Sequence, residues 1–317
     1  MMTAMGMTAV KLGSASYVPT TATCQISDAT RRRIGGFCCW PTVATRGGRA
    51  RAMAMACCCC CRTTLGSNPP DFDVSQRTSM IEVRKEIQRC YELVHKLGRG
   101  VIYLGSSRVK MDHSHYTQTV ELAREVAKLL DCTTWTGAGP GLMDAAFQGA
   151  FEANKPVGGL KIAREAGEWT SSNCHPYLPS EAYLTCRFFS ARKHGLVDAA
   201  VRNDLSDMTA VIALPGGIGT LDEVFEILAL IQLERIGSKH PVPFLLMNYD
   251  SYYSKLLSFI DECEIWGTVA RGEVASLWKV CSGNLEALEY LAEFYNLPES
   301  RRNYNIGGDV EQSNNLG

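Results

Sequence analysis

The chain of 317 residues has a net charge of −1 and a hydrophobic fraction of 46%, which provides apolar side chains for one sizeable core. The charge is uneven, because residues 1–70 carry eight basic residues against one acid, Asp28, which leaves −8 on the remainder. An acidic body argues against a nucleic-acid partner. No run of about 18 apolar residues occurs, which argues against a membrane span.

Residues 1–70 form a segment of distinct composition, rich in Ala, Thr, Arg and Met and without the compact apolar run of a secretory signal. An Arg-rich, hydroxyl-containing and acid-poor composition is typical of an organelle transit peptide. Scattered Thr and Ser without a basic amphipathic helix favour the plastid stroma, and a tail on a cytoplasmic protein is the alternative. The run Cys57–Cys61 lacks the spacing of a zinc site.

Apolar spacing predicts the elements of the body in chain order after a linker at 66–73. A helix over 79–97 and a buried strand over 101–104 come first, followed by a helix over 116–130, a strand over 132–136, a helix over 140–153 and a strand over 156–162. After an irregular stretch over 164–184 come a helix over 186–200, a strand over 208–214, a helix over 219–233, a strand over 242–248, a helix over 252–263, a strand over 273–281 and a helix over 285–295.

Strands that alternate with helices predict an α/β fold, in which a parallel sheet has helices on both faces. We expect three parts: a disordered transit peptide and linker at 1–70, one domain at 71–296, and a polar, frayed tail at 297–317. Ligands of such sheets bind beyond the carboxyl ends of the strands, so chemistry is expected in the loops after 104, 135, 162 and 214.

The strongest local signal is the segment Pro215–Glu223, which follows a predicted strand and opens a helix. Gly216, Gly217 and Gly219 allow a sharp turn and a close approach of backbone to ligand. The N–H groups and positive end of the helix suit a phosphate, and Thr220 adds a hydroxyl donor. Since no Lys-Ser or Lys-Thr follows the glycines, the loop is not a triphosphate P-loop. The alternative is a tight strand–helix connection.

A second glycine-rich loop, Thr136–Asp144, also joins a strand to a helix but fails the dinucleotide spacing because Leu142 occupies the third glycine's place. Its Gly139 and Gly141, together with Gly105 and Ser106 after the first strand, are predicted to form a neighbouring wall of one nucleotide site. Two ordinary turns are the alternative.

A basic pair, Arg192 and Lys193, lies in the helix that precedes the 208–214 strand. Arg suits an oxyanion because its planar fork binds two oxygens at once. A solvated helix face is the alternative interpretation.

The histidines of the body give no sign of a metal site. Metal-ligand spacing is lacking among His113, His115, His175 and His194, and we expect no metal.

Together, the Pro215–Glu223 motif and the preceding Arg192-Lys193 resemble the signature of the Lonely Guy phosphoribohydrolases, which were long described as lysine decarboxylase-like. The resemblance covers about residues 100–270 and is closer to the longer members. It implies a Rossmann-like homodimer without a cofactor, which acts on a nucleoside 5′-monophosphate such as AMP or a cytokinin riboside 5′-monophosphate. By motif, Arg192 and Glu223 are the implied catalytic pair. The implied substrate-binding residues are Lys193, Asp222 and the glycine loop Gly216–Thr220.

Four positions depart from the family's pattern: Ile218 replaces a common aromatic, Asp222 a common Glu, and Phe188-Phe189 the Met-His of short members. These changes leave the phosphate loop intact but affect the expected cytokinin preference. Hydrolysis of an N-glycosidic bond builds positive charge on the ribose, which a carboxylate such as Glu223 can stabilise. Trp169, Tyr177 or Tyr183 are candidates to stack on the base.

Three other classes of function place different demands on these residues. A carrier that binds a nucleotide or cofactor without catalysis would also keep glycine loops, although it needs neither Arg192 nor Glu223. A pyridoxal-phosphate decarboxylase needs a Schiff-base Lys in a recognisable setting, which Lys193 beside Arg192 does not provide. The failed fingerprint disfavours a dinucleotide oxidoreductase.

Overall fold

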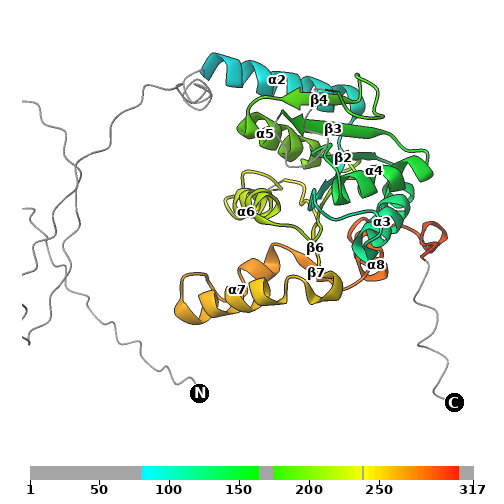
Figure 1. Ribbon diagram of the computed structural model, residues 1–317. Coiled ribbons are helices and arrows are strands. Elements are labelled where there is room, and N and C mark those ends of the chain that lie inside the picture. The colour runs from blue at the N-terminus through cyan, green and yellow to red at the C-terminus, as the bar shows by residue number, and fades with distance from the viewer. Residues whose placement is uncertain (1–79, 164–173, 238, 307–317) are drawn as a thin grey trace, which may run out of the picture. The chain divides into compact units, whose positions relative to one another are not determined.

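The computed structural model describes residues 80–163, 174–237 and 239–306, which form a seven-stranded sheet between two layers of helices (Figure 1). The strands are β1 (Gly100–Leu104), β2 (Thr133–Thr136), β3 (Val157–Ile162), β4 (Tyr183–Cys186), β5 (Ala210–Ala213), β6 (Phe244–Met247) and β7 (Lys279–Cys281). Their order is β4-β3-β2-β1-β5-β6-β7, and each neighbouring pair is parallel. The predicted Rossmann-like α/β class is confirmed.

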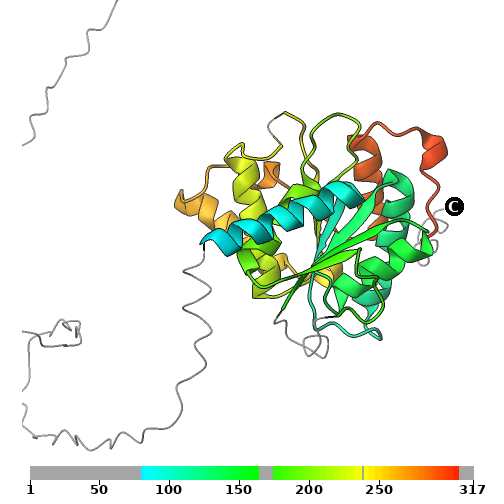
Figure 2. The same ribbon diagram turned by 90° about the horizontal axis from the view of Figure 1, so that it is seen from above.

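Helices cover both faces of this sheet, as Figure 1 and Figure 2 show. They are α2 (Met80–Leu97), α3 (Ser114–Leu130), α4 (Leu142–Glu152), α5 (Phe189–Ala200), α6 (Ile218–Gln232), α7 (Ser254–Trp266) and α8 (Asn284–Phe294). Strand β1 alternates between the two layers: Val101 and Tyr103 pack with α3, α4 and α8, whereas Ile102 and Leu104 pack with α2, α5 and α6. A strand that is apolar at every position must be covered on both faces, which explains the two layers.

The structure departs from the predicted elements at both edges of the sheet. The stretch predicted to be irregular over 164–184 ends in strand β4, Tyr183–Cys186, of which only Cys186 is buried. A short edge strand with one buried residue offers no continuous run of buried apolar positions for the sequence to show. At the other edge the strand predicted over 273–281 is limited to β7, because a 3-10 turn occupies Val274–Ser276.

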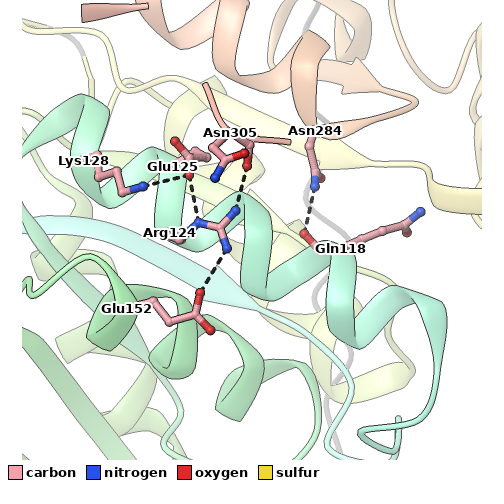
Figure 3. Close-up of polar contacts among 7 residues, drawn as sticks. All are labelled: Gln118, Arg124, Glu125, Lys128, Glu152, Asn284 and Asn305. Atoms are coloured by element: carbon pink, nitrogen blue, oxygen red, sulfur yellow. Dashed lines mark hydrogen bonds and ion pairs between the residues drawn. The ribbon is translucent and has the colours of Figure 1, made fainter. Parts of the chain in front are cut away.

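The segment 297–306 also differs from the frayed tail that its polarity predicts, and Figure 3 shows one of its contacts, between Asn305 and Arg124. Leu297 is buried, and the guanidinium of Arg301 donates to the carbonyl of Leu129 in the last turn of α3 (2.6 Å). Arg124 of α3 donates to the carbonyl of Asn305 at 2.7 Å. The polar residues are therefore used in hydrogen bonds to backbone groups, including one of the helix-end carbonyls that lack an intrahelical partner.

The predicted transit peptide and linker, residues 1–70, and the last residues of the tail, 307–317, lie outside the described residues, so these assignments stay predictions. In the part of the chain that the structure describes, none of the helices combines the length and apolar character needed to cross a membrane. Within the same ranges His, Cys, Asp and Glu nowhere gather in the groups of three or more that a metal ion requires.

Candidate active site at the centre of the sheet

Strands β1 and β5 lie side by side at the point where the strand order of the sheet reverses. From β1 the chain proceeds outward through β2 and β3 to β4, and from β5 it proceeds the opposite way through β6 to β7. Ligands of open parallel sheets bind where the two connections diverge, beyond the carboxyl ends of the strands. The loops at this point are 105–107 after β1 and 214–217 after β5, and both contain residues that the sequence predicts for the site.

The loop between β5 and α6 contains three glycines with two different roles. A Cβ atom on Gly216 would lie 2.2 Å from Oγ1 of Thr220, so packing requires glycine at this position. A Cβ atom on Gly217 or Gly219 would meet no described atom within 4 Å, and Gly217 has an ordinary φ of −90°. Neither glycine is needed for the fold, and both leave space beside the first turn of α6. N–H groups of a helix's first turn beside open space suit an anion such as a phosphate.

Two tyrosines that the sequence reasoning missed hold the backbone of this loop. The hydroxyl of Tyr253 donates to the carbonyl of Leu214 at 2.7 Å, and that of Tyr252 donates to the carbonyl of Gly216 at 2.9 Å. Burial raises the pKa of Tyr253, which keeps its hydroxyl protonated as a donor. The pair follows β6 at the carboxyl edge of the sheet, and this position was the signal that could have identified it.

The loop after β1 joins the two glycine loops. The carbonyl of Ser106 accepts the N–H of Leu142 at 2.9 Å, and the N–H of Ser106 donates to the carbonyl of Pro215 at 3.1 Å. Gly141 has a φ of +73°, and a Cβ on it would lie 2.3 Å from the Ser106 carbonyl, so both conformation and packing require glycine. Gly105 packs against Leu142 as well. The loops predicted to be neighbours are therefore in contact, and Gly139 of the second glycine-rich loop is buried.

Arg192 and Glu223 form a buried ion pair across α5 and α6, with Nη1 of Arg192 3.3 Å from Oε1 of Glu223. The residues are 5% and 7% exposed. Nε of Arg192 donates to the carbonyl of Leu160 within β3 at 3.0 Å. Gly137 leaves room for the guanidinium, because a Cβ there would lie 1.9 Å from Nη2 of Arg192. The guanidinium is thus fixed in place before any ligand binds.

Lys193 contacts two acids of α6 rather than open space. Its ammonium lies 3.0 Å from Oδ2 of Asp222 and 2.7 Å from Oε2 of Glu226. Partial burial opposes the charged ammonium, but the hydrogen bonds to Glu226 and Asp222 outweigh it and raise the pKa of Lys193. Lys193 and Asp222 therefore neutralise each other across the α5–α6 seam, and a role for either in holding a substrate stays a prediction.

The predicted aromatic residues contribute to a polar cluster beside α4. The hydroxyl of Tyr177 donates to the buried carboxylate of Asp144, and Tyr116 donates to its other oxygen at 2.6 Å. The hydroxyl of Tyr183 accepts the N–H of His175 at 2.9 Å. These contacts hold the segment 174–183 against the domain and do not test base stacking. Trp169 lies outside the described residues.

Fold and site together define a doubly wound α/β protein in which an anion-suited glycine loop adjoins a buried arginine–glutamate pair. The family model described as "possible lysine decarboxylase" matches residues 143–291. A probable cytokinin riboside 5′-monophosphate phosphoribohydrolase of Oryza sativa subsp. japonica, LOGL6, is 30% identical over 194 residues, which are 58% of this chain and 68% of the relative. The corresponding enzyme LOG4 of Arabidopsis thaliana is 30% identical over 171 residues, 53% of this chain and 69% of the relative.

The chain therefore belongs to the Lonely Guy family of possible lysine decarboxylases, as its motifs indicate. Among solved structures, the molybdenum cofactor binding protein of the phototrophic bacterium Rippkaea orientalis matches 61% of this chain and 94% of its own. The TM-score is 0.39 and the sequence identity 19%, so this likeness is too distant to indicate a function.

Proposed function

We propose that the protein hydrolyses the N-glycosidic bond of a nucleoside 5′-monophosphate and releases the free base and ribose 5-phosphate. The observation that supports this activity best is the buried Arg192–Glu223 pair next to the open glycine loop. Relatives named as cytokinin riboside 5′-monophosphate phosphoribohydrolases point to the same reaction. The substrate class is a cytokinin riboside 5′-monophosphate or a similar AMP-like nucleotide.

In the proposed mechanism the phosphate binds the N–H groups at the start of α6 and the hydroxyl of Thr220. This places the ribose toward Glu223 in the same helix. As the bond between base and ribose breaks, positive charge develops on the ribose, and the carboxylate stabilises it and orients the attacking water. The water supplies a hydroxyl group to the ribose carbon and a proton to the departing base.

Arg192 has the task of holding Glu223 in position. Because Leu160, Gly137 and Glu223 fix its guanidinium from three sides, the carboxylate needs no rearrangement when substrate arrives. Preorganisation of this kind is worth about 10²–10³ in rate for a single well-placed group.

The direct test is release of base from a panel of nucleoside 5′-monophosphates, including AMP and isopentenyladenosine monophosphate, by the full chain. Glu223→Gln should lower the rate by about 10²–10⁴ without unfolding the protein. Glu289→Gln removes an exposed carboxylate of α8 and should leave the rate unchanged. If the wild type binds a monophosphate but releases no base from any of them, a non-catalytic carrier is the better account.

We further infer that the protein is a homodimer. Helix α7 has no buried residue, yet it carries the apolar side chains Phe259, Ile265 and Trp266, which are 59%, 83% and 82% exposed. Phe225 of α6 and Leu233, the residue directly after this helix, are also exposed. Apolar surface of this kind is typical of a contact with another chain. Light scattering after size exclusion tests this inference, and a monomer at micromolar concentration would contradict it.

The composition of residues 1–70 supports import into the plastid stroma as a further proposal. A fluorescent protein that carries residues 1–70 at its N-terminus should accumulate in plastids, and the fluorescent protein alone should stay in the cytoplasm. Cytoplasmic fluorescence of the protein that carries residues 1–70 would favour the alternative, a cytoplasmic protein with a tail.

A further inference from the structure

The N-terminus of α5 is capped by a residue from a distant helix. Phe188 is the N-cap of α5 and its side chain accepts no hydrogen bond, since it is apolar. Instead the N–H of Arg187 donates to Oε1 of Glu86 at 2.8 Å, and the N–H of Phe188 donates to Oε2 at 2.8 Å. Glu86 belongs to α2 and is 8% exposed. Its two oxygens thus serve two backbone donors at the positive end of α5.

A short chain of hydrogen bonds leads from this carboxylate to the proposed active site. Phe188 donates its N–H to Glu86, and its carbonyl accepts the N–H of Arg192 at 3.2 Å. The side chain of Arg192 then continues to the carbonyl of Leu160 and to Glu223. Only one residue, Phe188, therefore separates the Glu86 cap from the backbone of Arg192.

The surrounding packing limits what the cap contributes to the attachment of α2. Cys90 and Val94 of α2 are fully buried, and a Cβ on Gly195 of α5 would lie 2.7 Å from Cβ of Cys90. Arg99, just beyond α2, adds an ion pair with Asp198 of α5 at 3.1 Å. The helices α2 and α5 are thus held together by contacts that do not involve Glu86, and the cap acts on the first turn of α5.

We propose that Glu86 is a positioning residue for the reaction, acting through the first turn of α5 to hold Arg192 against Glu223. This proposal rests on the proposed function, because it assigns a remote residue to the same site. A carboxylate is needed, since a Gln offers one acceptor and turns an NH₂ group toward the second backbone N–H. That donor would be left unsatisfied in a buried place, and the first turn would shift to find another partner.

The test compares Glu86→Gln with Glu82→Gln. Glu82 lies one turn earlier on the same helix and pairs with the side chain of Arg187 at 3.0 Å, but it is exposed and contacts no backbone group of α5. Steady-state base release, measured well below the unfolding temperature, should show a fall in kcat of about tenfold or more in Glu86→Gln, since small misplacements of a catalytic group have effects of this order. KM should change less than about threefold, because the phosphate loop lies on α6. Glu82→Gln should match the wild type.

A second readout does not depend on turnover. The Nε–H signal of Arg192 in a nitrogen-15 NMR spectrum, assigned by its loss in Arg192→Lys, should shift or broaden in Glu86→Gln and stay in place in Glu82→Gln. If the wild type releases no base, the proposed function fails while this signal still tests the positioning role. An unchanged Arg192 signal in folded Glu86→Gln, or an unchanged kcat with only a lower melting temperature, would make Glu86 a structural cap and overturn the proposal. If Glu86→Gln does not fold, Glu86→Asp, which keeps the charge but shortens the side chain, is measured with the same two outcomes.

Discussion

The two sides of the candidate site are built from different materials. On one side, Arg192 and Glu223 form a wall of buried side chains, and Gly137 leaves space for the guanidinium of Arg192. We call this the side-chain wall. On the other side, the segment Gly216–Thr220 offers mainly backbone, and Gly217 and Gly219 face open space. We call this the backbone wall.

This difference indicates a division of labour. A charged pair that is buried and held from several directions is costly to build and stays in place once folding has built it. Backbone N–H groups next to open space bind any ligand with a suitably placed phosphate, whatever base it carries. The side-chain wall is thus suited to the chemical step and the backbone wall to binding. Discrimination between bases has to come from residues outside both walls.

Among the changes that test this comparison, the largest effect is expected from Gly137→Ala, which breaks the side-chain wall. The added methyl group would lie 1.9 Å from Nη2 of Arg192 and would displace the guanidinium from Glu223. We expect base release to fall by about 10²-fold, as misplacement by about 1 Å can do. Gly158→Ala is the control, because its methyl group clashes with the ring of Trp135 and tests a packing defect that does not touch Arg192. Equal losses of kcat in the two folded variants would contradict the special role of Gly137.

The backbone wall should respond differently to Gly217→Ala. Because φ is −90° and no described atom lies within 4 Å of the new methyl group, the substitution should cause no clash in the free protein. Gly217 is the N-cap of α6, so the poorer capping by Ala opposes its lower unfolded-state entropy, and the stability should change by less than about 1 kcal/mol. The same methyl group would occupy the space that a phosphate needs, and Kd for AMP should rise about tenfold, or 1.4 kcal/mol. Calorimetric titration and thermal unfolding without ligand measure both effects. An unchanged Kd would show that phosphate binds elsewhere.

Sequence reasoning reached the backbone wall more easily than the supports of the side-chain wall. The glycine loop is continuous in sequence, and its position after a strand and before a helix marks it as a ligand loop. Arg192 and Glu223 were identified through the family motif, and the structure brings them within 3.3 Å of each other. The 31 positions between Arg192 and Glu223 correspond to no helix or strand period. Without the motif, Arg192 would therefore look like any other basic residue on a helix.

The supports could not be predicted because each joins distant parts of the chain. Glu86 lies 102 positions before Phe188, and no periodicity marks a carboxylate that caps another helix. Tyr253 serves a carbonyl 39 positions earlier. Lys193 illustrates the converse, because its charge suggested a phosphate ligand, whereas Asp222 and Glu226 one helix away already neutralise it. Contacts of this kind depend on the packed fold and leave no trace in composition or spacing.

A smaller effect is expected from the loss of the tyrosine hydroxyls that hold the backbone wall. Tyr253→Phe leaves the buried carbonyl of Leu214 without its 2.7 Å hydrogen bond, which should cost about 1 kcal/mol and lower the melting temperature by roughly 2–4 °C. Tyr252→Phe is the matched variant. Since Tyr252 is 50% exposed, water can replace its hydroxyl at the carbonyl of Gly216, and the loss should be smaller. Equal losses in differential scanning calorimetry would show that both tyrosines support the loop alike.

The smallest effect concerns His175, which lies against Phe147 of α4 and Tyr183 of β4. Burial lowers the pKa of His175 to about 4, while Asp144 opposes this shift and Lys161 adds to it. Its Nδ1 accepts the N–H of Leu178 at 3.1 Å, as the neutral ring can. The pKa of a histidine in an unfolded chain is about 6.5. Between that pH and about 4, the unfolded chain therefore binds a proton that the folded protein does not. Stability from this group is therefore complete above about pH 6.5 and declines as the pH falls toward 4.

His175→Asn tests this expectation, because the amide oxygen can still accept the N–H of Leu178 but cannot titrate. Between pH 7.5 and 6, the melting temperature of the wild type should fall further than that of the variant, by at most roughly 4 °C. Comparison of the two proteins cancels the titration of every other group. Parallel pH profiles would mean that His175 is protonated equally in the folded and unfolded states, and that water reaches the segment 174–178 in the folded protein.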